Sequence, residues 1–274
     1  MICNICNNNN FEYDNQISAK CKTCGILYNL NARPLNYSNG GGQNIPKTKK
    51  SELRIQNALQ RFKIIKRYMD NHDVFVDIGC GSGEMLEASK QYFKFHLGYD
   101  ENKILIAYTQ NKGLNTYNKC FERKDIKIKS SCGIVVSVSH VLEHVEKPLD
   151  MLKNIIDELR DNDILYIEVP LYTGYSFKIK KYNWSLWYDE HLALYSIKTL
   201  QMLARQLNLC ILEYGYRNFY SDNFNKKLAL KLFIRNPIKF LQRHIQRKSY
   251  QLLLDNQLRD FGFIVCKIQK GKND

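Results

Sequence analysis

Long apolar runs and tryptophan are both scarce in this chain. No apolar run approaches the roughly 20 residues that a membrane-spanning helix needs. The first residues, MICNICNNNN, lack the charged and apolar regions of a signal peptide, so we expect a cytoplasmic protein. Only 2 Trp and 5 Pro occur among 274 residues, yet apolar residues make up 44% and include 18 Tyr and 13 Phe. This composition excludes a disordered or fibrous chain.

Acidic residues are also few. The chain has 27 Asp and Glu against 41 Lys and Arg, a formal charge of +14, which predicts a polyanionic partner or a negatively charged surface. The stretch from Phe224 to Tyr250 holds eight Lys or Arg and no acidic residue, and Pro237 interrupts its helical pattern. It predicts attachment to an anionic membrane at its inner face. RNA binding and a solvated helical pair at the sheet edge remain alternatives.

Two close pairs of cysteines stand near the N-terminus. They are Cys3-x-x-Cys6 and Cys21-x-x-Cys24, separated by fourteen residues. In a reducing cytosol such pairs indicate a metal site, and four thiolates suit a tetrahedral, closed and therefore structural Zn²⁺ site. A redox CxxC is disfavoured because no βαβ pattern surrounds either pair. We expect a zinc ribbon over residues 1–36 and a Gly-rich linker over 37–52.

Short apolar runs alternate with helical patterns between residues 74 and 170. This rhythm predicts an α/β fold with right-handed crossovers and a mostly parallel sheet. A helical pattern begins at Ser51 and leads into this region. A helix over 197–207, a strand around 209–216 and a last strand, FGFIVCKI, are expected after it. The second domain therefore spans 53–274, with a basic helical insertion at about 222–259.

A glycine-rich turn follows the first predicted strand of this domain, in VDIGCGSGE from Val76 to Glu84. Its G-x-G-x-G spacing differs from the G-x-G-x-x-G of dinucleotide-binding folds, and no Gly-Lys-Ser/Thr of a P-loop is present, so pyrophosphate is not the favoured ligand. Asp100 ends the next strand, FHLGYD, 23 positions beyond Asp77. That separation suits a carboxylate that binds ribose hydroxyls. The sequence therefore predicts a nucleoside-like ligand.

These features resemble the class I S-adenosylmethionine-dependent methyltransferases, whose first motif is similar to VDIGCGSGE and whose second ends a strand in an acidic residue such as Asp100. The resemblance covers about residues 53–217. It implies a Rossmann-like sheet of seven strands with a reversed last hairpin, helices on both faces, and S-adenosylmethionine as cofactor. The residues that it implies around the cofactor are Asp77, Gly79, Cys80, Gly81, Gly83, Asp100, Phe121, Ser139 and His140.

Two histidine clusters follow later in the chain. The first, H-x-x-E-H from His140 to His144, is also the pattern of inverted zinc peptidases, but its place at the carboxyl edge of the sheet disfavours that function. The second runs from Trp187 to His191, WYDEH, and combines an acid, a base and a phenol. Methyl transfer to oxygen or to an enolisable carbon needs a proton acceptor of this kind. An N-terminal cap network for the following helix is the alternative for Glu190 and His191.

The segment from Tyr188 to Leu209 resembles sugar methyltransferases of deoxysugar and surface-polysaccharide pathways, some of which carry a four-Cys zinc module. The resemblance implies an acceptor site that consists of His144, Tyr188, Glu190 and His191. We therefore expect methyl transfer from S-adenosylmethionine to a sugar, sugar phosphate or nucleotide sugar. The leading alternative is an rRNA or tRNA methyltransferase that uses its ribbon and basic surface for docking. A cofactor-binding scaffold without turnover is the third hypothesis.

Overall fold

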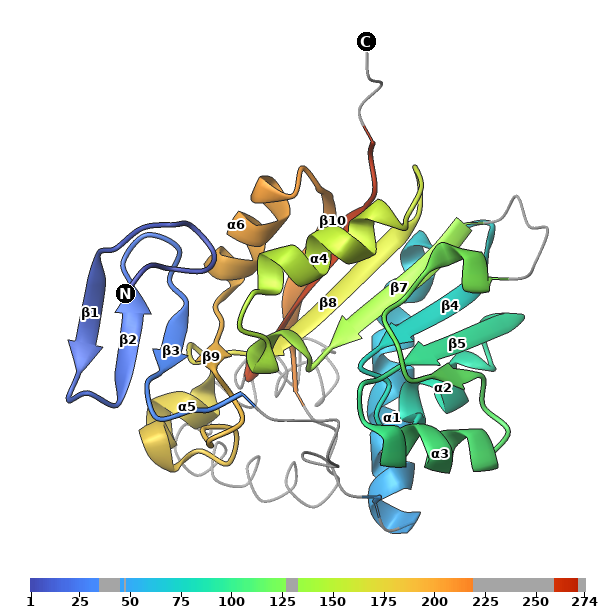
Figure 1. Cartoon of the computed structure of the whole chain (residues 1–274), viewed down its shortest axis with the longest axis horizontal. Coiled ribbons are helices and arrows are strands. Elements are labelled where there is room, and N and C mark those ends of the chain that lie inside the picture. Colours follow the sequence, from blue (N-terminus) through green and yellow to red (C-terminus); the bar gives the residue numbers. More distant parts are fainter. Residues whose placement is uncertain (35–44, 47, 127–132, 219–258, 271–274) are drawn as a thin grey trace, which may run out of the picture.

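The computed structural model describes residues 1–34, 45–46, 48–126, 133–218 and 259–270 (Figure 1). The basic stretch 224–250, and nearly all of the insertion predicted at 222–259, lies outside the described residues. Within those ranges, no helix combines the length and apolarity needed to cross a membrane.

A sheet of seven strands forms the centre of the larger domain, in the order β10-β11-β8-β7-β4-β5-β6. The strands are β4 (His72–Ile78), β5 (Phe95–Tyr99), β6 (Thr116–Tyr117), β7 (Gly133–Ser139), β8 (Ile164–Pro170), β10 (Cys210–Arg217) and β11 (Phe261–Lys267). The strands from β4 to β8 are parallel, whereas β11 runs antiparallel to both β8 and β10. The predicted parallel sheet with a reversed last hairpin is therefore confirmed.

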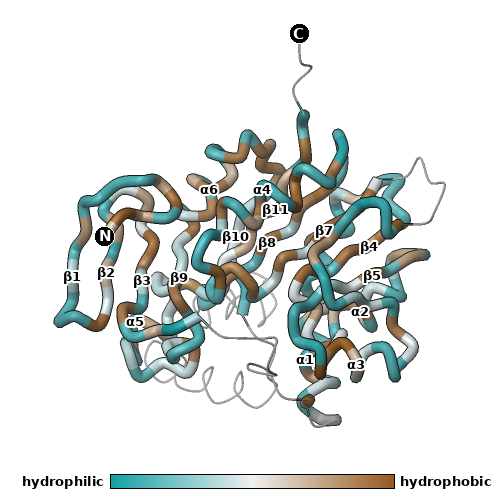
Figure 2. Tube along the Cα trace, viewed as in Figure 1, coloured by the Kyte–Doolittle hydropathy of each residue, from teal (hydrophilic) through white to brown (hydrophobic). Residues whose placement is uncertain are grey.

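Helices cover both faces of the sheet because its central strands are apolar on both sides. The helices are α1 (Thr48–Ile65), α2 (Glu84–Ser89), α3 (Lys103–Asn111), α4 (Pro148–Asp157), α5 (Tyr175–Lys180) and α6 (Ile197–Gln206). On β4, Phe75 packs in one core cluster with side chains of α1, α2 and α3, while Val74 and Val76 pack in another with side chains of α4 and α6. Figure 2 shows hydrophobic residues along β4, β7 and β8, as buried parallel strands require.

The four-Cys segment supplies three strands of a second, antiparallel sheet. Its strands are β1 (Phe11–Asp14), β2 (Ser18–Cys21) and β3 (Leu27–Asn29), and all four cysteines lie at the end of this sheet that meets the larger domain. A fourth strand, β9 (Ala193–Leu194), comes from the larger domain and pairs with β3 (Figure 1). Residues 1–34 therefore form a ribbon that shares a sheet with the segment after Tyr188.

The helix α6 begins where the sequence predicts it. The Ser196 hydroxyl accepts a hydrogen bond from Thr199 N at 3.1 Å, and the Thr199 hydroxyl accepts one from Ser196 N at 3.3 Å, which makes a capping box. Glu190 and His191 precede this cap by several residues. Their side chains are therefore available for a role other than capping α6.

Candidate active site

The glycine-rich turn lies at the carboxyl end of β4, before α2. Gly79, Gly81 and Gly83 have φ of +71°, +52° and +85°, a region that other L-residues rarely adopt. A Cβ on Gly79 would lie 2.4 Å from Cγ2 of Val141, so the backbone approaches the segment after β7 as closely as atoms allow. The amides of Gly79 and Cys80 donate to Tyr99 O at 2.7 and 3.1 Å. The turn is thereby fixed to the end of β5.

Asp100 follows β5 and faces this turn. Its Oδ2 accepts a hydrogen bond from Gly81 N at 2.8 Å, and its Oδ1 accepts one from Asn102 N at 2.8 Å. Each carboxylate oxygen retains acceptor capacity, which ribose hydroxyls can use. Burial raises the pKa of Asp100, and it raises the pKa of Asp77, at the end of β4, to about 7.

Cys80, Phe121 and Ser139 lie close to the same edge of the sheet. Burial raises the pKa of the Cys80 thiol well above its usual range, so this thiol stays protonated. Phe121 packs edge-on against Tyr99, with ring centroids 5.4 Å apart. The buried Ser139 Oγ, at the end of β7, has no hydrogen-bond partner among the residues described. This edge of the sheet therefore offers a turn that favours glycine, the fixed carboxylate of Asp100 and the buried hydroxyl of Ser139. These groups fit the ribose and methionine parts of S-adenosylmethionine.

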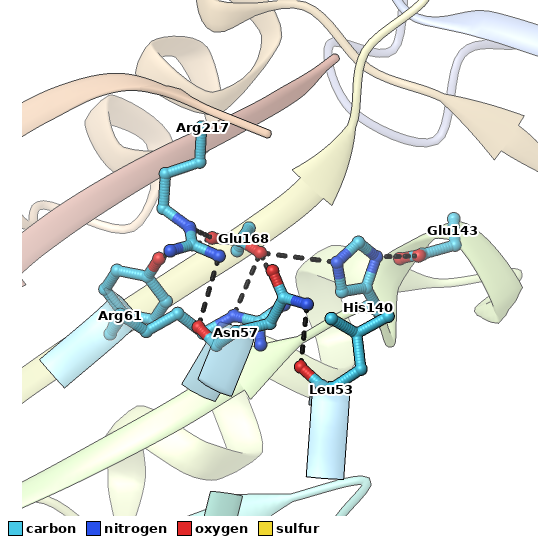
Figure 3. A network of polar contacts seen from close by, with 8 residues as sticks. Leu53, Asn57, Arg61, His140, Glu143, Glu168 and Arg217 are labelled. Carbon is cyan, nitrogen blue, oxygen red and sulfur yellow. Dashed lines mark hydrogen bonds and ion pairs between the residues drawn. The ribbon is translucent and has the colours of Figure 1, made fainter. Parts of the chain in front are cut away.

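His140, predicted beside the cofactor, takes part in a buried ionic network (Figure 3). Its Nδ1 lies 3.1 Å from Oε1 of Glu143, and its Nε2 lies 3.3 Å from Oε1 of Glu168. Burial opposes a charge on the ring, but the two carboxylates outweigh burial and raise the pKa of His140. The imidazole therefore joins the carboxylate of β8 to that of Glu143, on the segment that follows β7.

Glu168 is the centre of this network. It is fully buried, and its oxygens accept hydrogen bonds from Arg61 Nη2, Arg217 Nε and the Tyr166 hydroxyl, each at 2.6 Å. Burial disfavours the carboxylate, yet the guanidiniums of Arg217 and Arg61 hold the pKa of Glu168 well below its usual range. The network therefore fixes α1, β8 and β10 around one buried charge, and His140 extends it toward the second histidine cluster.

The structure brings together three of the four side chains predicted at the acceptor site. The rings of Tyr188 and His191 lie 4.2 Å apart, and those of His144 and His191 lie 4.6 Å apart. Glu190 meets the cluster through its backbone, because its carbonyl oxygen is 2.9 Å from Nδ1 of His144. The cluster thus combines the ends of two segments that follow β7 and β8.

Backbone carbonyls set the tautomers of both imidazoles. Nδ1 of His144 lies against Glu190 O, and Nδ1 of His191 lies 2.7 Å from Leu186 O. Because a carbonyl can only accept, both Nδ1 atoms carry a proton, and in the neutral ring Nε2 keeps its lone pair. Burial lowers the pKa of His191 to about 4, so at neutral pH this ring is neutral. His191 therefore offers an unprotonated nitrogen.

Glu143 lies beside the two imidazoles. It is fully buried, and its Oε2 has no hydrogen-bond partner within the described part of the chain. One potential ligand atom each of Glu143, His144 and His191 lies within 4.8 Å of the others. A carboxylate in this position stabilises an imidazolium that forms beside it. The same three groups also suit a divalent metal ion, which would occupy the lone pairs that proton transfer needs.

The four cysteines predicted as metal ligands form a compact cluster in the ribbon. Their sulfur atoms all lie within 4.8 Å of one another, with Cys3 and Cys24 at 3.5 Å and Cys6 and Cys21 at 3.5 Å. Four thiol groups at these distances fit a tetrahedral Zn²⁺ ion.

The sequence did not indicate Glu143, Glu168, Arg61 or Arg217 as parts of the site. Glu168 carries a detectable sign, since it is the acidic residue of the otherwise apolar strand ILYIEVP, and a charge in such a strand needs a buried partner. Its partners Arg61 and Arg217 are 107 and 49 positions away along the chain, so periodicity does not reveal them. Glu143 lies within the H-x-x-E-H motif, but the sequence predicted no function for it.

We expect Glu168→Gln to lower the free energy of unfolding by about 3–5 kcal/mol, because it leaves two buried guanidiniums without their carboxylate. Urea unfolding followed by circular dichroism measures the change. Glu213→Gln is the matched control, because Glu213 pairs with the exposed Arg67, and we expect about 0–1 kcal/mol there. Equal losses in the two variants would contradict the central role of Glu168.

We also expect His191 to titrate near pH 4, well below the usual value of about 6.5, because its burial disfavours the charged ring. Since the unfolded chain then binds more protons between these pH values, His191 lowers stability as pH falls through that window. NMR of the imidazole resonances measures the titration, and the chain has only 6 His to assign. A His191 pKa at or above 6.5 would refute the neutral-ring assignment.

Comparison with known proteins places the fold. A family described as "Methyltransferase domain" matches residues 51–214, which is more than half of the chain. No curated protein matches the sequence.

Several solved structures share the fold at low sequence identity. An S-adenosylmethionine-dependent methyltransferase from Archaeoglobus fulgidus has a TM-score of 0.53 and 19% identity, over 78% of this chain and 94% of the other. A chain from a complex of the Haloferax volcanii Trm112 methyltransferase activator with a methyltransferase has a TM-score of 0.53 and 14% identity, over 87% and 100%. The plantazolicin methyltransferase BamL, in complex with a triazolic desmethylPZN analog and S-adenosylhomocysteine (SAH), has a TM-score of 0.50 and 14% identity, over 81% and 87%.

The family match covers the glycine-rich turn, Asp100 and both histidine clusters, and the seven-stranded sheet with its reversed last hairpin agrees with the fold that the resemblance implied. The chain therefore belongs to the methyltransferase-domain family and is an S-adenosylmethionine-dependent methyltransferase.

Proposed function

We propose that the enzyme methylates a small polar acceptor, a sugar, sugar phosphate or nucleotide sugar, at a hydroxyl group. The observation that carries the proposal is the buried imidazole of His191, whose Nδ1 is bound to Leu186 O while its Nε2 keeps a lone pair, and which lies beside the ring of His144. Tyr188, a partly exposed phenol, adjoins them. This cluster of two imidazoles and a phenol is polar and partly exposed, so it suits a hydroxylated ligand better than an apolar one.

The residues around the glycine-rich turn would hold the cofactor. Asp100 would accept hydrogen bonds from its ribose hydroxyls, and the Gly79–Gly83 backbone would accommodate its methionine part. Phe121 would cover the adenine, with Asp77, Cys80, Ser139 and His140 completing the surroundings. When bound, S-adenosylmethionine supplies an electrophilic methyl group on sulfur.

The acceptor-side residues would bind, orient and deprotonate the acceptor hydroxyl. His191 would take the hydroxyl proton at Nε2, and the Glu143 carboxylate would stabilise the resulting imidazolium. Burial raises the pKa of Tyr188, so its phenol stays protonated and can donate a hydrogen bond to the acceptor. His144 is the second candidate for the proton, and Glu190 positions it through its carbonyl group. Holding the acceptor in line would supply much of the rate.

The ribbon supports a small acceptor rather than RNA. Its strand β3 is paired with β9, and the carbonyl of its metal-ligand residue Cys24 is bonded to α6, so these surfaces are occupied within the chain. Binding of the basic stretch 224–250 to an anionic membrane surface, and with it a position at the inner face of the membrane, stays a prediction.

We expect His191→Ala and His144→Ala to lower kcat, the former by about 10²–10⁴-fold, because the acceptor loses its base. Calorimetry should show S-adenosylmethionine binding unchanged in both. His96→Ala, on β5 away from the cluster, is the matched control. The acceptor panel consists of nucleotide sugars, sugar phosphates and RNA.

Near-normal turnover by both histidine variants would refute the base assignment. Turnover with RNA alone would refute the acceptor class. If activity requires a second divalent ion per chain, beyond the four-Cys site, the result would refute proton transfer by this cluster. It would indicate that Glu143, His144 and His191 bind a metal ion instead.

We further propose that Cys3, Cys6, Cys21 and Cys24 bind one structural Zn²⁺ ion. Purified protein should contain about one zinc per chain, and Cys21→Ser should lose it, because three thiolates leave the coordination sphere open. Elemental analysis measures this, with Cys120→Ser, an exposed cysteine of the larger domain, as the control. Zinc-free protein that folds normally would contradict the assignment.

A further inference from the structure

The strand β3 of the ribbon continues as a strap along the acceptor segment. Leu27 and Tyr28 pair with Leu194 and Ala193, which makes the β3–β9 connection antiparallel. Beyond this pairing, Asn29 N donates to Leu192 O at 2.9 Å, and Arg33 N donates to Asp189 O at 2.8 Å. Residues 27–33 therefore run beside residues 189–194, and the position of His191 is set between these contacts.

Asn29 adds a side-chain contact to this strap. It is buried, and its Nδ2 donates a hydrogen bond to Tyr188 O at 3.2 Å. Its Oδ1 accepts one from Asn31 N at 3.2 Å, which fixes the orientation of the amide. Asn29 thus holds the backbone of Tyr188, a residue of the proposed acceptor site.

The metal-ligand loops of the ribbon contact the same half of the larger domain. The Thr199 hydroxyl, at the start of α6, donates to Cys24 O at 3.0 Å. Beside Cys3, the side chain of Asn4 donates to Glu146 O at 2.6 Å, two residues after His144. Cys24, and Asn4 beside Cys3, therefore contact the start of α6 and the segment that follows His144.

The two acceptor-site segments are also bonded to each other. Leu192 N donates to Glu143 O at 2.7 Å, and His144 Nδ1 donates to Glu190 O at 2.9 Å. Together with the ribbon contacts, these bonds connect three segments: the ribbon, residues 188–194 and residues 143–146. Each segment is hydrogen-bonded to the other two. The glycine turn is fixed differently, by Tyr99 O and by the carboxylate of Asp100.

We infer that the four-Cys ribbon is a positioning element for the acceptor half of the active site, with Asn29 as its main positioning residue. A metal-loaded ribbon holds Tyr188, His191 and His144 in the arrangement that the chemistry needs. The cofactor half, at the glycine turn and Asp100, forms without it. The catalytic consequence rests on the function proposed above, whereas the structural coupling does not.

The first test compares Asn29→Ala with Asn9→Ala in the full chain. Asn9 is an exposed asparagine of the same ribbon and is the matched control. For Asn29→Ala we expect unchanged zinc content, unchanged S-adenosylmethionine affinity, and faster hydrogen exchange at the amides of residues 188–194. With a true acceptor, kcat should fall about 10-fold at a nearly constant cofactor KM, because the base is displaced. Asn9→Ala should match the wild type in each measurement.

The second test removes the metal from the full chain with a chelator and restores it with Zn²⁺. Trp184 and Trp187 are the only 2 Trp of the chain, and both pack in a cluster with Leu27 of the ribbon. Their emission therefore reports on residues 184–187, which immediately precede the acceptor-site residues 188–194 and pack against the ribbon. We expect a red shift on chelation, its reversal by Zn²⁺, and S-adenosylmethionine binding within about twofold of the loaded protein.

Three results would overturn the inference. Unchanged hydrogen exchange in residues 188–194 of Asn29→Ala would show that the strap does not hold the acceptor loop. Loss of cofactor binding in parallel with the red shift would show that the ribbon supports the whole fold. A chelated protein with unchanged emission would show that the metal has no part in positioning. Hydrogen exchange and emission need no acceptor, so an error in the acceptor class would leave these readouts decisive.

Discussion

The geometry of the candidate active site depends on one buried charge, the carboxylate of Glu168, and on the two arginines that neutralise it. Glu168 lies in the central strand β8 with no exposed surface, so its carboxylate is tolerable only while Arg61 and Arg217 remain beside it. These arginines come from α1 and from the end of β10, so the charge requirement fixes two elements against the sheet. His140 then bridges from Glu168 to Glu143, and this carries the same constraint to the acceptor site.

The candidate active site has two halves that are built by different kinds of interaction, one proposed for the cofactor and one for the acceptor. The cofactor half depends on local backbone geometry, a turn of left-handed glycines bonded to the ends of neighbouring parallel strands. The acceptor half depends on long-range contacts among three segments, one of which is the ribbon. Parallel sheets place variable loops at their carboxyl edge. Here a second, four-stranded sheet pairs the ribbon with β9, beside those loops.

The geometry of the proposed cofactor half could be predicted from the sequence because its determinants are local. The glycines, the flanking strand and Asp100 stand within one βαβ unit, and the spacing of Cys3, Cys6, Cys21 and Cys24 specifies the thiol cluster directly. The pairing of β3 with β9 could not be predicted, since Ala193–Leu194 is too short for a periodicity and lies far along the chain. Likewise, the sequence indicates an acid at Glu190, but only the fold shows that its carbonyl makes the contact.

Orientation and protonation are linked in the acceptor half, because backbone carbonyls hold both imidazoles. The carbonyls of Glu190 and Leu186 hold the Nδ1 protons of His144 and His191, so the segment that places each ring also decides which nitrogen carries the proton. A shift of residues 186–191 would therefore change the tautomer as well as the position of the proposed base. A side-chain carboxylate, the more common partner of a catalytic histidine, can rotate to keep its hydrogen bond when the backbone shifts. A backbone carbonyl moves with the backbone and cannot compensate in this way. The proposed proton transfer therefore depends strongly on the contacts that fix residues 186–191.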